Sequence, residues 1–328
     1  MIKYICVVYT MIFYANKGSP VNIQDDVIVL SPSKPKNKVK STLLIISKIS
    51  LCFVLIVGAV MGGNIVGDLI IGKFDTFDPS KYKEENYIET QANIDLWMSQ
   101  DISKLNATQI FVVAENKLLA NQCYGVYTKG YDGGEKGTVT TLGMKQDLYG
   151  YRYRLYEKGY FDYYSTGLAT VVKKVEFTFG EDKYYCFEGK INGDKTDFTP
   201  YKTESGCEYR TGEEYKAMAG VSADNAIDYI VSTKTVLSFK DNGKVGDFHS
   251  YTLNLNPNTS VLKYVKKMDY MSGFGYPKFS NIELRFEVDD DMNFRNIYIN
   301  EDYKVIGMSA NGKYKMEFVY GEENVEIR

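Results

Sequence analysis

Histidine is almost missing from this chain, which contains one, His249, in 328 residues. Nucleophilic catalysis of the Ser/His or Cys/His kind needs an imidazole beside the nucleophile, so His249 is the one base available for such chemistry. It falls near the start of an expected strand, on the same face as Tyr251, and this indicates a structural position. We therefore predict that the protein is not an enzyme, with no catalytic residues and no cofactor.

A large excess of charge of one sign is also missing. The 39 basic and 42 acidic residues leave a formal net charge of -3. Binding to nucleic acid requires a concentrated basic surface, which this balance does not supply. Nucleic acid is therefore not an expected partner.

Cysteine is scarce, and its spacing excludes the common zinc motifs. Of the five cysteines, three follow the hydrophobic run described below, namely Cys123, Cys186 and Cys207. This odd number allows no complete disulfide framework. No pair of Cys or His residues has the spacing of a metal site, so no metal is predicted. Cys186 and Cys207 are either a candidate disulfide or two packed thiols, and the sequence leaves both interpretations open.

One long uncharged run is present, from Ile49 to Gly67. It is about long enough for a helix to cross the hydrocarbon core of a bilayer. Lysines precede it and acidic residues follow it, an asymmetry that places the N-terminus in the cytoplasm. The alternative is a cleavable signal peptide, whose apolar part would run from Ile49 to Met61. Both interpretations export the rest of the chain.

The hydrophobic run divides the chain into four parts. We predict a cytoplasmic N-terminal tail (1–41), a single-pass transmembrane signal anchor (42–71), a polar linker (72–86) and an extracytoplasmic α+β domain (87–328). Residues 1–16 are either a second membrane contact or the product of a mis-set start codon. The predicted location is the cell membrane with the C-terminal domain outside, as in a bacterial surface protein.

Alternation of apolar and charged residues indicates an antiparallel sheet. Tyr149, Tyr151 and Tyr153 share one face of an expected strand, while Arg152 and Arg154 share the other. Two further segments repeat this alternation, at residues 171–179 and 281–289. Residue pairs that suit tight hairpins stand between such runs, at Asp132-Gly133, Asn192-Gly193, Asn242-Gly243 and Asn311-Gly312. The predicted sheet is apolar on one side and wet on the other.

Helices are expected at three places. The first runs from Glu89 to Ser99 and is followed by a strand at Gln109 to Val113. Ser222 can cap a second helix, from Ala223 to Ser232. Asn258 or Thr259 can cap a third, which continues to Met268 with one apolar face toward the sheet. Together with the strands, these helices predict an α+β fold.

The order of elements from about Thr235 to Tyr320 is distinctive. A strand, a DNG turn and a YTLNL strand lead into an NTSVLKYVKKM helix, a Gly/Pro loop, and the strands NIELRFEVDDD and FRNIYINEDYKV. This order resembles the exported half-barrel proteins of the LolA and LppX type. The resemblance implies a curved antiparallel sheet covered by helices, with a cavity that holds acyl chains. The chain differs from that family in its expected anchor, which has no lipobox, and in its extra N-terminal outer region.

The resemblance predicts a membrane-anchored, non-catalytic module that binds lipid or another apolar ligand in a half-barrel groove. A curved sheet that helices cover incompletely leaves such a groove. Its candidate lining residues are Tyr251, Leu253, Leu255, Val261, Leu262, Val265, Leu284, Phe286 and Val288. The other interpretation is that these side chains pack together and leave no cavity.

Tyrosine is the most unusual feature that is present. The chain has 29 tyrosines against a single tryptophan, and they concentrate between Tyr149 and Tyr164. Tyrosine offers a large rigid contact area with a polar tip, which suits recognition surfaces. The alternative function is therefore a cell-surface interaction or sensory domain that binds a protein or a glycan through these strands. An exposed cluster of Tyr149, Tyr151 and Tyr153 would favour it.

Overall fold

The computed structural model describes residues 77–132, 146–166, 171–179, 183–192, 195–200, 209–223, 225–272, 276–305 and 308–328. All of them belong to one unit, Val60–Arg328. The predicted tail (1–41) and signal anchor (42–71) lie outside the described residues. Within the described ranges, no helix has the length and apolar character needed to cross a membrane.

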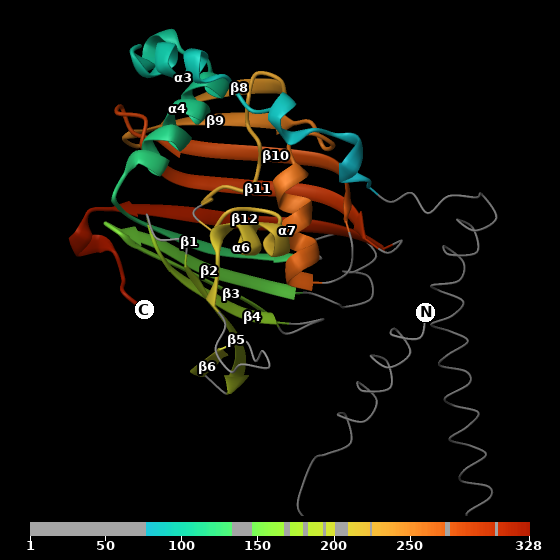
Figure 1. Ribbon diagram of the computed structural model, residues 1–328. Coiled ribbons are helices and arrows are strands. Elements are labelled where there is room, and N and C mark those ends of the chain that lie inside the picture. The colour runs from blue at the N-terminus through green and yellow to red at the C-terminus, as the bar shows by residue number, and fades with distance from the viewer. Residues whose placement is uncertain are drawn as a thin grey trace, which may run out of the picture. The chain divides into compact units, whose positions relative to one another are not determined.

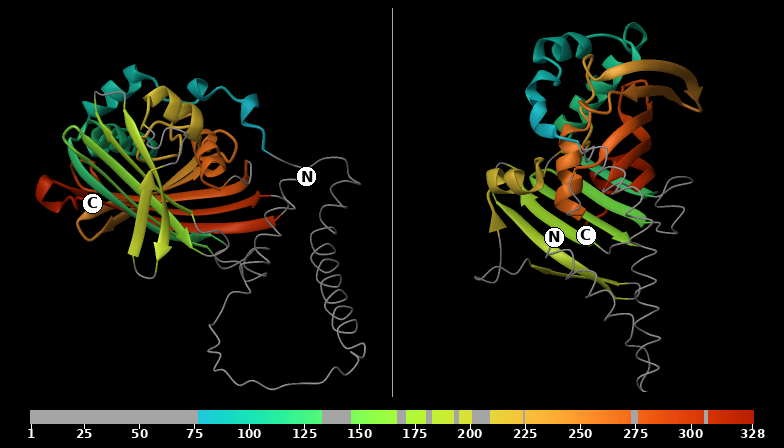
Figure 2. Two further views of the ribbon diagram at one scale, coloured as in Figure 1. Left: turned by 60° about the horizontal axis from the view of Figure 1, so that its bottom comes forward. Right: turned by 90° about the vertical axis from the view of Figure 1, so that its right-hand side faces the viewer.

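One antiparallel sheet organises the described chain (Figure 1). Its strands are β1 (Cys123–Asp132), β2 (Gln146–Leu155), β3 (Lys158–Thr166), β4 (Val171–Thr178), β5 (Tyr184–Asn192), β6 (Lys195–Pro200), β7 (Tyr209–Arg210), β8 (Val236–Val245), β9 (Phe248–Leu255), β10 (Lys278–Val288), β11 (Phe294–Val305) and β12 (Met308–Tyr320). The spatial order is β6-β5-β4-β3-β2-β1-β12-β11-β10-β9-β8, and β7 pairs with β5. From β1 to β6 and from β8 to β12, strands that follow one another in the sequence pair in space, and β12 pairs with β1 to join the two series. The sheet is curved and open, with edges at β6 and β8 (Figure 2).

Helices cover one face of this sheet, which we call the inner face. They are α3 (Gln91–Met98), α4 (Ala107–Ala120), α6 (Gly212–Ala219) and α7 (Leu262–Ser272). Short 3-10 turns flank them or follow the sheet, at Pro79–Lys81, Glu84–Asn86, Ile102–Lys104 and Glu322–Asn324. The main core joins α3, α4 and α7 to β9–β12 and to the start of β1, and a smaller core lies between α6 and β3–β5. The predicted α+β class and antiparallel sheet are confirmed.

Several local predictions are also confirmed. The helix expected at Glu89–Ser99 is α3, and Thr90 caps it by accepting a hydrogen bond from the backbone N–H of Asn93. The alternating segments 148–156 and 281–289 are β2 and β10. The helix expected to end at Met268 is α7, which begins at Leu262 and continues to Ser272. The regular spacing of apolar residues along the sequence located these elements.

The prediction of a strand at Gln109–Val113 is wrong, because this segment lies inside α4. A short apolar run fits a buried helix as well as a buried strand. The deciding signal is a capping box, in which Asn106 accepts from the N–H of Gln109 and the Gln109 side chain accepts from the N–H of Asn106.

The helix predicted at Ala223–Ser232 is also wrong. The described residues between 221 and 235 are irregular, and the helix of this region is α6, which lies earlier in the chain. Thr211 and Glu214 form its capping box, and Gly220 ends it in the left-handed conformation at φ 74°. In the run Ile227–Val231, four of the five side chains are buried although the segment is neither helix nor strand.

Two predicted hairpin turns are displaced. Asn242-Gly243 lies inside β8 at a register shift, and the turn to β9 comes after Val245. Asn311-Gly312 lies inside β12, where Asn311 pairs with Asp302 of β11. For the other two pairs, the second residue lies outside the described ranges. A residue pair that tolerates positive φ therefore marks a bulge or a strand interior here as well as a turn.

Glu115 of α4 gives the fold a pH dependence. Burial raises the pKa of its carboxyl to about 7, and the charge of Lys263 opposes this shift only in part. The raised pKa means that the folded state disfavours the charged form, so stability falls as the pH rises from about 4.5 toward 7. Since one pKa unit corresponds to about 1.4 kcal/mol, Glu115→Gln is expected to be about 3 kcal/mol more stable than wild type at pH 8 and no more stable at pH 4.

Unfolding curves at the two pH values measure this difference. The exposed Glu213→Gln of α6 is the matched control and is expected to show no comparable gain. A Glu115→Gln stability gain that is equal at pH 4 and pH 8 would contradict the assignment.

Candidate functional site

The predicted groove residues come together in the structure, but as part of the main core. All nine are buried, from Tyr251 on β9 to Val288 on β10. Phe286 lies with its ring centroid 5.2 Å from that of Phe111 and 5.3 Å from that of Tyr251. Helix α4, which the sequence did not predict, supplies Phe111 and covers these residues. Contacts between side chains of the sheet and of α4 therefore occupy this part of the inner face.

Tyrosines gather instead on the opposite, outer face of β1–β3. Antiparallel register places Tyr127 opposite Tyr151, Tyr153 opposite Tyr160, and Tyr149 opposite Tyr164. Their ring centroids lie 4.5, 5.1 and 4.8 Å apart, respectively. We call this surface the outer tyrosine face, and define it as Tyr127, Tyr149, Tyr151, Tyr153, Tyr160 and Tyr164. It is continuous across three strands because alternate residues of each strand point to the same side.

The predicted partition of β2 between tyrosines and arginines is confirmed, but the arginine side is not simply wet. Arg152 lies on the inner face, where its guanidinium is 4.9 Å from the ring of Phe161 and donates to the carbonyl of Ala223. Arg154 donates to the carbonyl of Leu119. Both arginines thus join β2 to segments on the inner side of the sheet.

The segment Gly321–Arg328, which we call the strap, crosses the outer tyrosine face. The N–H of Gly321 donates to the carbonyl of Cys123 on β1, and the N–H of Glu326 donates to the hydroxyl of Tyr151. Val325 is buried in a small cluster with Tyr151, Tyr153, Leu155 and Tyr160. Tyr151, only 1% exposed, is therefore covered. The tyrosines cluster, but Tyr151 and Tyr153 are buried, so the exposed cluster of all three tyrosines that would favour the alternative function is not present while the strap covers them.

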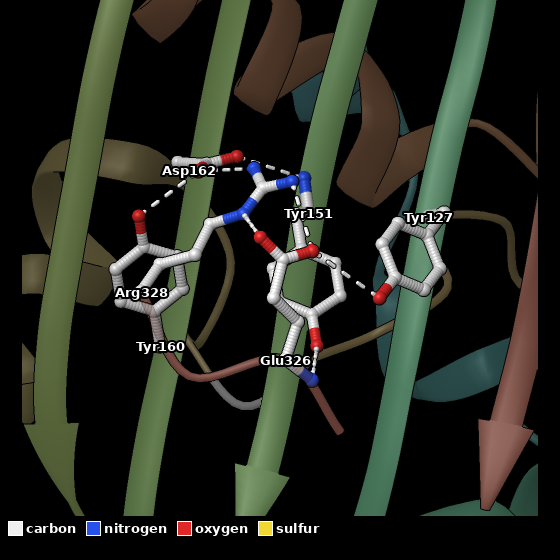
Figure 3. Close-up of polar contacts among 6 residues, drawn as sticks. All are labelled: Tyr127, Tyr151, Tyr160, Asp162, Glu326 and Arg328. Carbon is white, nitrogen blue, oxygen red and sulfur yellow. Dashed lines mark hydrogen bonds and ion pairs between the residues drawn. The ribbon is translucent and has the colours of Figure 1, made fainter. Parts of the chain in front are cut away.

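Asp162 of β3 is the polar centre of this site (Figure 3). Its side chain is 8% exposed. One of its carboxylate oxygens accepts from the N–H of Tyr151 at 2.9 Å. The other accepts from the Tyr160 hydroxyl and from the Arg328 guanidinium, each at 2.9 Å. The guanidinium lies 4.5 Å from the centroid of the Tyr151 ring. The carboxylate thus holds a cation against an aromatic ring, a favourable arrangement when partly desolvated.

Glu326 completes the site from the strap itself. Its carboxylate accepts from the Nε of Arg328 at 3.0 Å and from the hydroxyl of Tyr127 at 3.4 Å. The hydrogen bond from Arg328 lowers the pKa of Glu326 below its usual range, and partial burial opposes this shift. Burial lowers the pKa of Arg328, but its bonds to Glu326 and Asp162 outweigh that effect and the pKa is raised. Both groups are therefore charged at neutral pH.

The buried phenols of the site remain protonated. Burial, followed by the charge of Asp162, raises the pKa of Tyr160. Burial, followed by the contact with Tyr127, raises the pKa of Tyr151. Tyr160 therefore donates a hydrogen bond to Asp162, and Tyr151 remains a neutral acceptor for the strap. This arrangement holds and orients the charged groups of the strap.

Several contacts hold the strap, and most of them involve side chains: Tyr156 donates to Glu322 at 2.8 Å, Val325 is buried, and Arg328 pairs with Asp162. Burial of one valine side chain contributes roughly 1.5 kcal/mol, and a partly exposed ion pair contributes about 1 kcal/mol. Ile327 of the strap is 67% exposed. We expect local opening of the strap to cost less free energy than unfolding of the sheet, since the strap joins the sheet by fewer backbone hydrogen bonds than a paired strand does.

A cavity of about 370 Å³ adjoins the start of the strap. It is lined by Phe248, Asp289, Asn293, Phe294, Arg295, Phe318, Val319, Tyr320 and Asn324. Tyr320 ends β12, and Asn324 belongs to the strap.

The remaining sequence candidates lie elsewhere. Cys186 is buried in β5 next to α6, and Cys207 lies outside the described residues, so their disulfide remains a prediction. His249 of β9 pairs with Asp290 at 2.8 Å, in the turn region after β10. Sequence reasoning missed Asp162 and the strap altogether. The contact between Arg328 and Asp162 spans 166 positions, and no local pattern signals it.

The described residues define a protein with an open, curved antiparallel sheet that carries helices on one face and a tyrosine cluster on the other. Comparison of the sequence with models of protein families and with curated proteins finds no match. The function is therefore argued from the site.

Proposed function

We propose that this protein is a non-catalytic binding module that segment 42–71 holds at the outside of the cell membrane, and that it binds a partner through the outer tyrosine face. One observation carries the proposal: this face already holds a polypeptide segment, the strap, by ring contacts, hydrogen bonds and an ion pair. Paired tyrosines on neighbouring strands give a rigid surface whose hydroxyls suit contacts with a protein or a glycan.

Binding of lipid or another apolar ligand on the inner face has less support. The nine residues that would line the groove are buried against one another and against α4. An acyl chain would have to separate α4 from the sheet, which would expose Phe111 and its neighbours. The outer tyrosine face needs no such rearrangement beyond the strap.

Photo-crosslinking in intact cells tests the proposed face. A photoreactive phenylalanine analogue replaces Tyr149, which is partly buried on the outer tyrosine face, in the full chain. The control position is Asn254, an exposed residue of β9 on the same side of the sheet. We expect a specific crosslinked product at position 149 and none at position 254. Equal yields at both positions, or no product at either, would argue against the proposal.

A membrane-impermeant biotin reagent applied to the same cells tests the location. Lysines of the domain, such as the exposed Lys240 of β8, are expected to react in intact cells. Labelling that requires lysis of the cells would show that the domain lies inside, and would overturn the extracytoplasmic part of the proposal.

A further inference from the structure

The site beneath the strap has the chemistry of an arginine receptor. We propose that it binds an arginine-bearing segment of a partner protein, and that the strap occupies the site in cis until such a segment displaces it. This inference rests on the proposed function and narrows its partner from a protein or a glycan to a protein with a defined short motif.

The cation site favours arginine over other cations. Asp162 is fixed before any ligand arrives, since the N–H of Tyr151 and the hydroxyl of Tyr160 donate to its two oxygens. The flat guanidinium of Arg328 lies against the Tyr151 ring while one of its nitrogens reaches Asp162. A planar guanidinium can stack and donate at once, whereas the ammonium of lysine is a compact, strongly hydrated charge.

A second recess accepts an aliphatic side chain three positions before the arginine. Val325 occupies it, among Tyr151, Tyr153, Leu155 and Tyr160. The carboxylate of Glu326 accepts hydrogen bonds from Arg328 and from Tyr127. Ile327 is exposed, so the site requires no particular side chain at its position. The expected motif in a partner is therefore an aliphatic residue, an acidic residue, any residue and an arginine.

The strap is built to be displaced. From Glu326 onward, the backbone contact that joins it to the described sheet is the single hydrogen bond from the N–H of Glu326 to the hydroxyl of Tyr151. A strand added to the sheet would instead form a ladder of backbone bonds. The start of the strap is joined to β1 by the hydrogen bond from the N–H of Gly321 to the carbonyl of Cys123. From Val325 onward the remaining contacts are those of side chains, so a segment with the same side chains can replace this part of the strap.

Peptide binding to the full chain tests this inference. The probe is a synthetic peptide with the strap sequence GEENVEIR, and its control carries glutamine in place of the arginine. The receptor is the full chain with Val325→Asp and Arg328→Gln, which remove both anchors of the strap and leave the site unchanged. Calorimetry measures binding, and circular dichroism during thermal unfolding confirms that each variant is folded.

We expect the released variant to bind the arginine peptide at least tenfold more tightly than wild type does, because the tethered strap competes at a high effective concentration. The glutamine peptide is expected to bind at least tenfold more weakly than the arginine peptide. Adding Asp162→Asn to the released variant is expected to reduce the affinity for the arginine peptide by at least tenfold. Arg328→Gln alone is a second receptor, with an intermediate gain expected.

Equal binding of the two peptides by the folded released variant, or by Arg328→Gln if the double variant does not fold, would overturn the inference. If position 149 is crosslinked in cells but the receptor shows no preference for the arginine peptide, the proposed function is supported and only the arginine motif is rejected. Preference for the arginine peptide without crosslinking in cells would support the site chemistry and argue against the proposed function.

Discussion

Phe286→Ala is expected to lower the free energy of unfolding by about 4 kcal/mol, the size of effect seen when a fully buried phenylalanine is truncated. Phe286 has no exposed surface, and its ring contacts Phe111, Tyr251 and Phe294. Truncation leaves a cavity between β10 and α4 that this closely packed cluster cannot readily fill. Chemical unfolding followed by fluorescence measures the loss, with the single tryptophan, Trp97 in the main core, as the probe.

The matched control is Phe239→Ala. Phe239 lies on the edge strand β8 and is 52% exposed, so its truncation is expected to cost less than about 1 kcal/mol. The two variants also test whether Phe286 belongs to a packed core or lines a ligand groove. A Phe286→Ala variant that keeps wild-type stability but loses co-purifying lipid would show that this face lines a ligand site, against the present account.

Glu301→Leu is expected to cost about 3 kcal/mol or more, since removing one member of a buried polar cluster strands its partners. Glu301 of β11 is fully buried on the inner face. Tyr264 donates to one of its oxygens at 3.0 Å, and both Tyr229 and Tyr314 donate to the other. Burial, followed by the charge of Glu301, raises the pKa of Tyr229 and of Tyr314, so both phenols stay protonated donors.

Glu301→Gln removes the negative charge of the side chain but keeps a hydrogen-bond acceptor for the phenols. Glutamine keeps one carbonyl oxygen and nearly the same shape, so a smaller loss than that of the leucine variant is expected. Glu283→Leu, at an exposed position on the outer side of β10, controls for the substitution itself. Unfolding curves of the four chains measure the differences. A leucine variant as stable as wild type would mean that the three phenols do not depend on Glu301.

The parts of the fold that repeat over a short distance were predictable. The two-residue period of Tyr149, Tyr151 and Tyr153 located β2 and separated its tyrosines from its arginines. The arginine side, expected to be wet, is the side that the helices cover. The same signal located β10, and helical spacing located α7. These predictions succeeded because strand and helix periods are properties of a single element.

The failures arose where a local signal had two solutions. The run that begins at Gln109 is apolar on nearly every position, and the N-cap at Asn106 rather than the run itself decides for a helix. Asn242-Gly243 suits a hairpin, yet the register with β9 carries the strand past it as a bulge. Tertiary pairing selected between alternatives that the local sequence allowed.

The candidate site combines both situations. Its tyrosines were visible in the sequence, since the period of β2 put them on one side. Which side of the sheet the helices leave uncovered depended on α4 and α6, whose packing against the other face was not predicted. The role of Asp162 depended on a strap more than a hundred positions away, as the contact between Arg328 and Asp162 illustrates.

The most direct test of the binding surface compares crosslinking at position 149 in intact cells between the wild-type chain and the Arg328→Gln chain. If the outer tyrosine face binds the partner and the strap competes for it, the yield at position 149 exceeds that at position 254 and rises several-fold when Arg328 is replaced. If the yield at position 149 equals that at position 254 in both chains, the outer tyrosine face is not the binding surface.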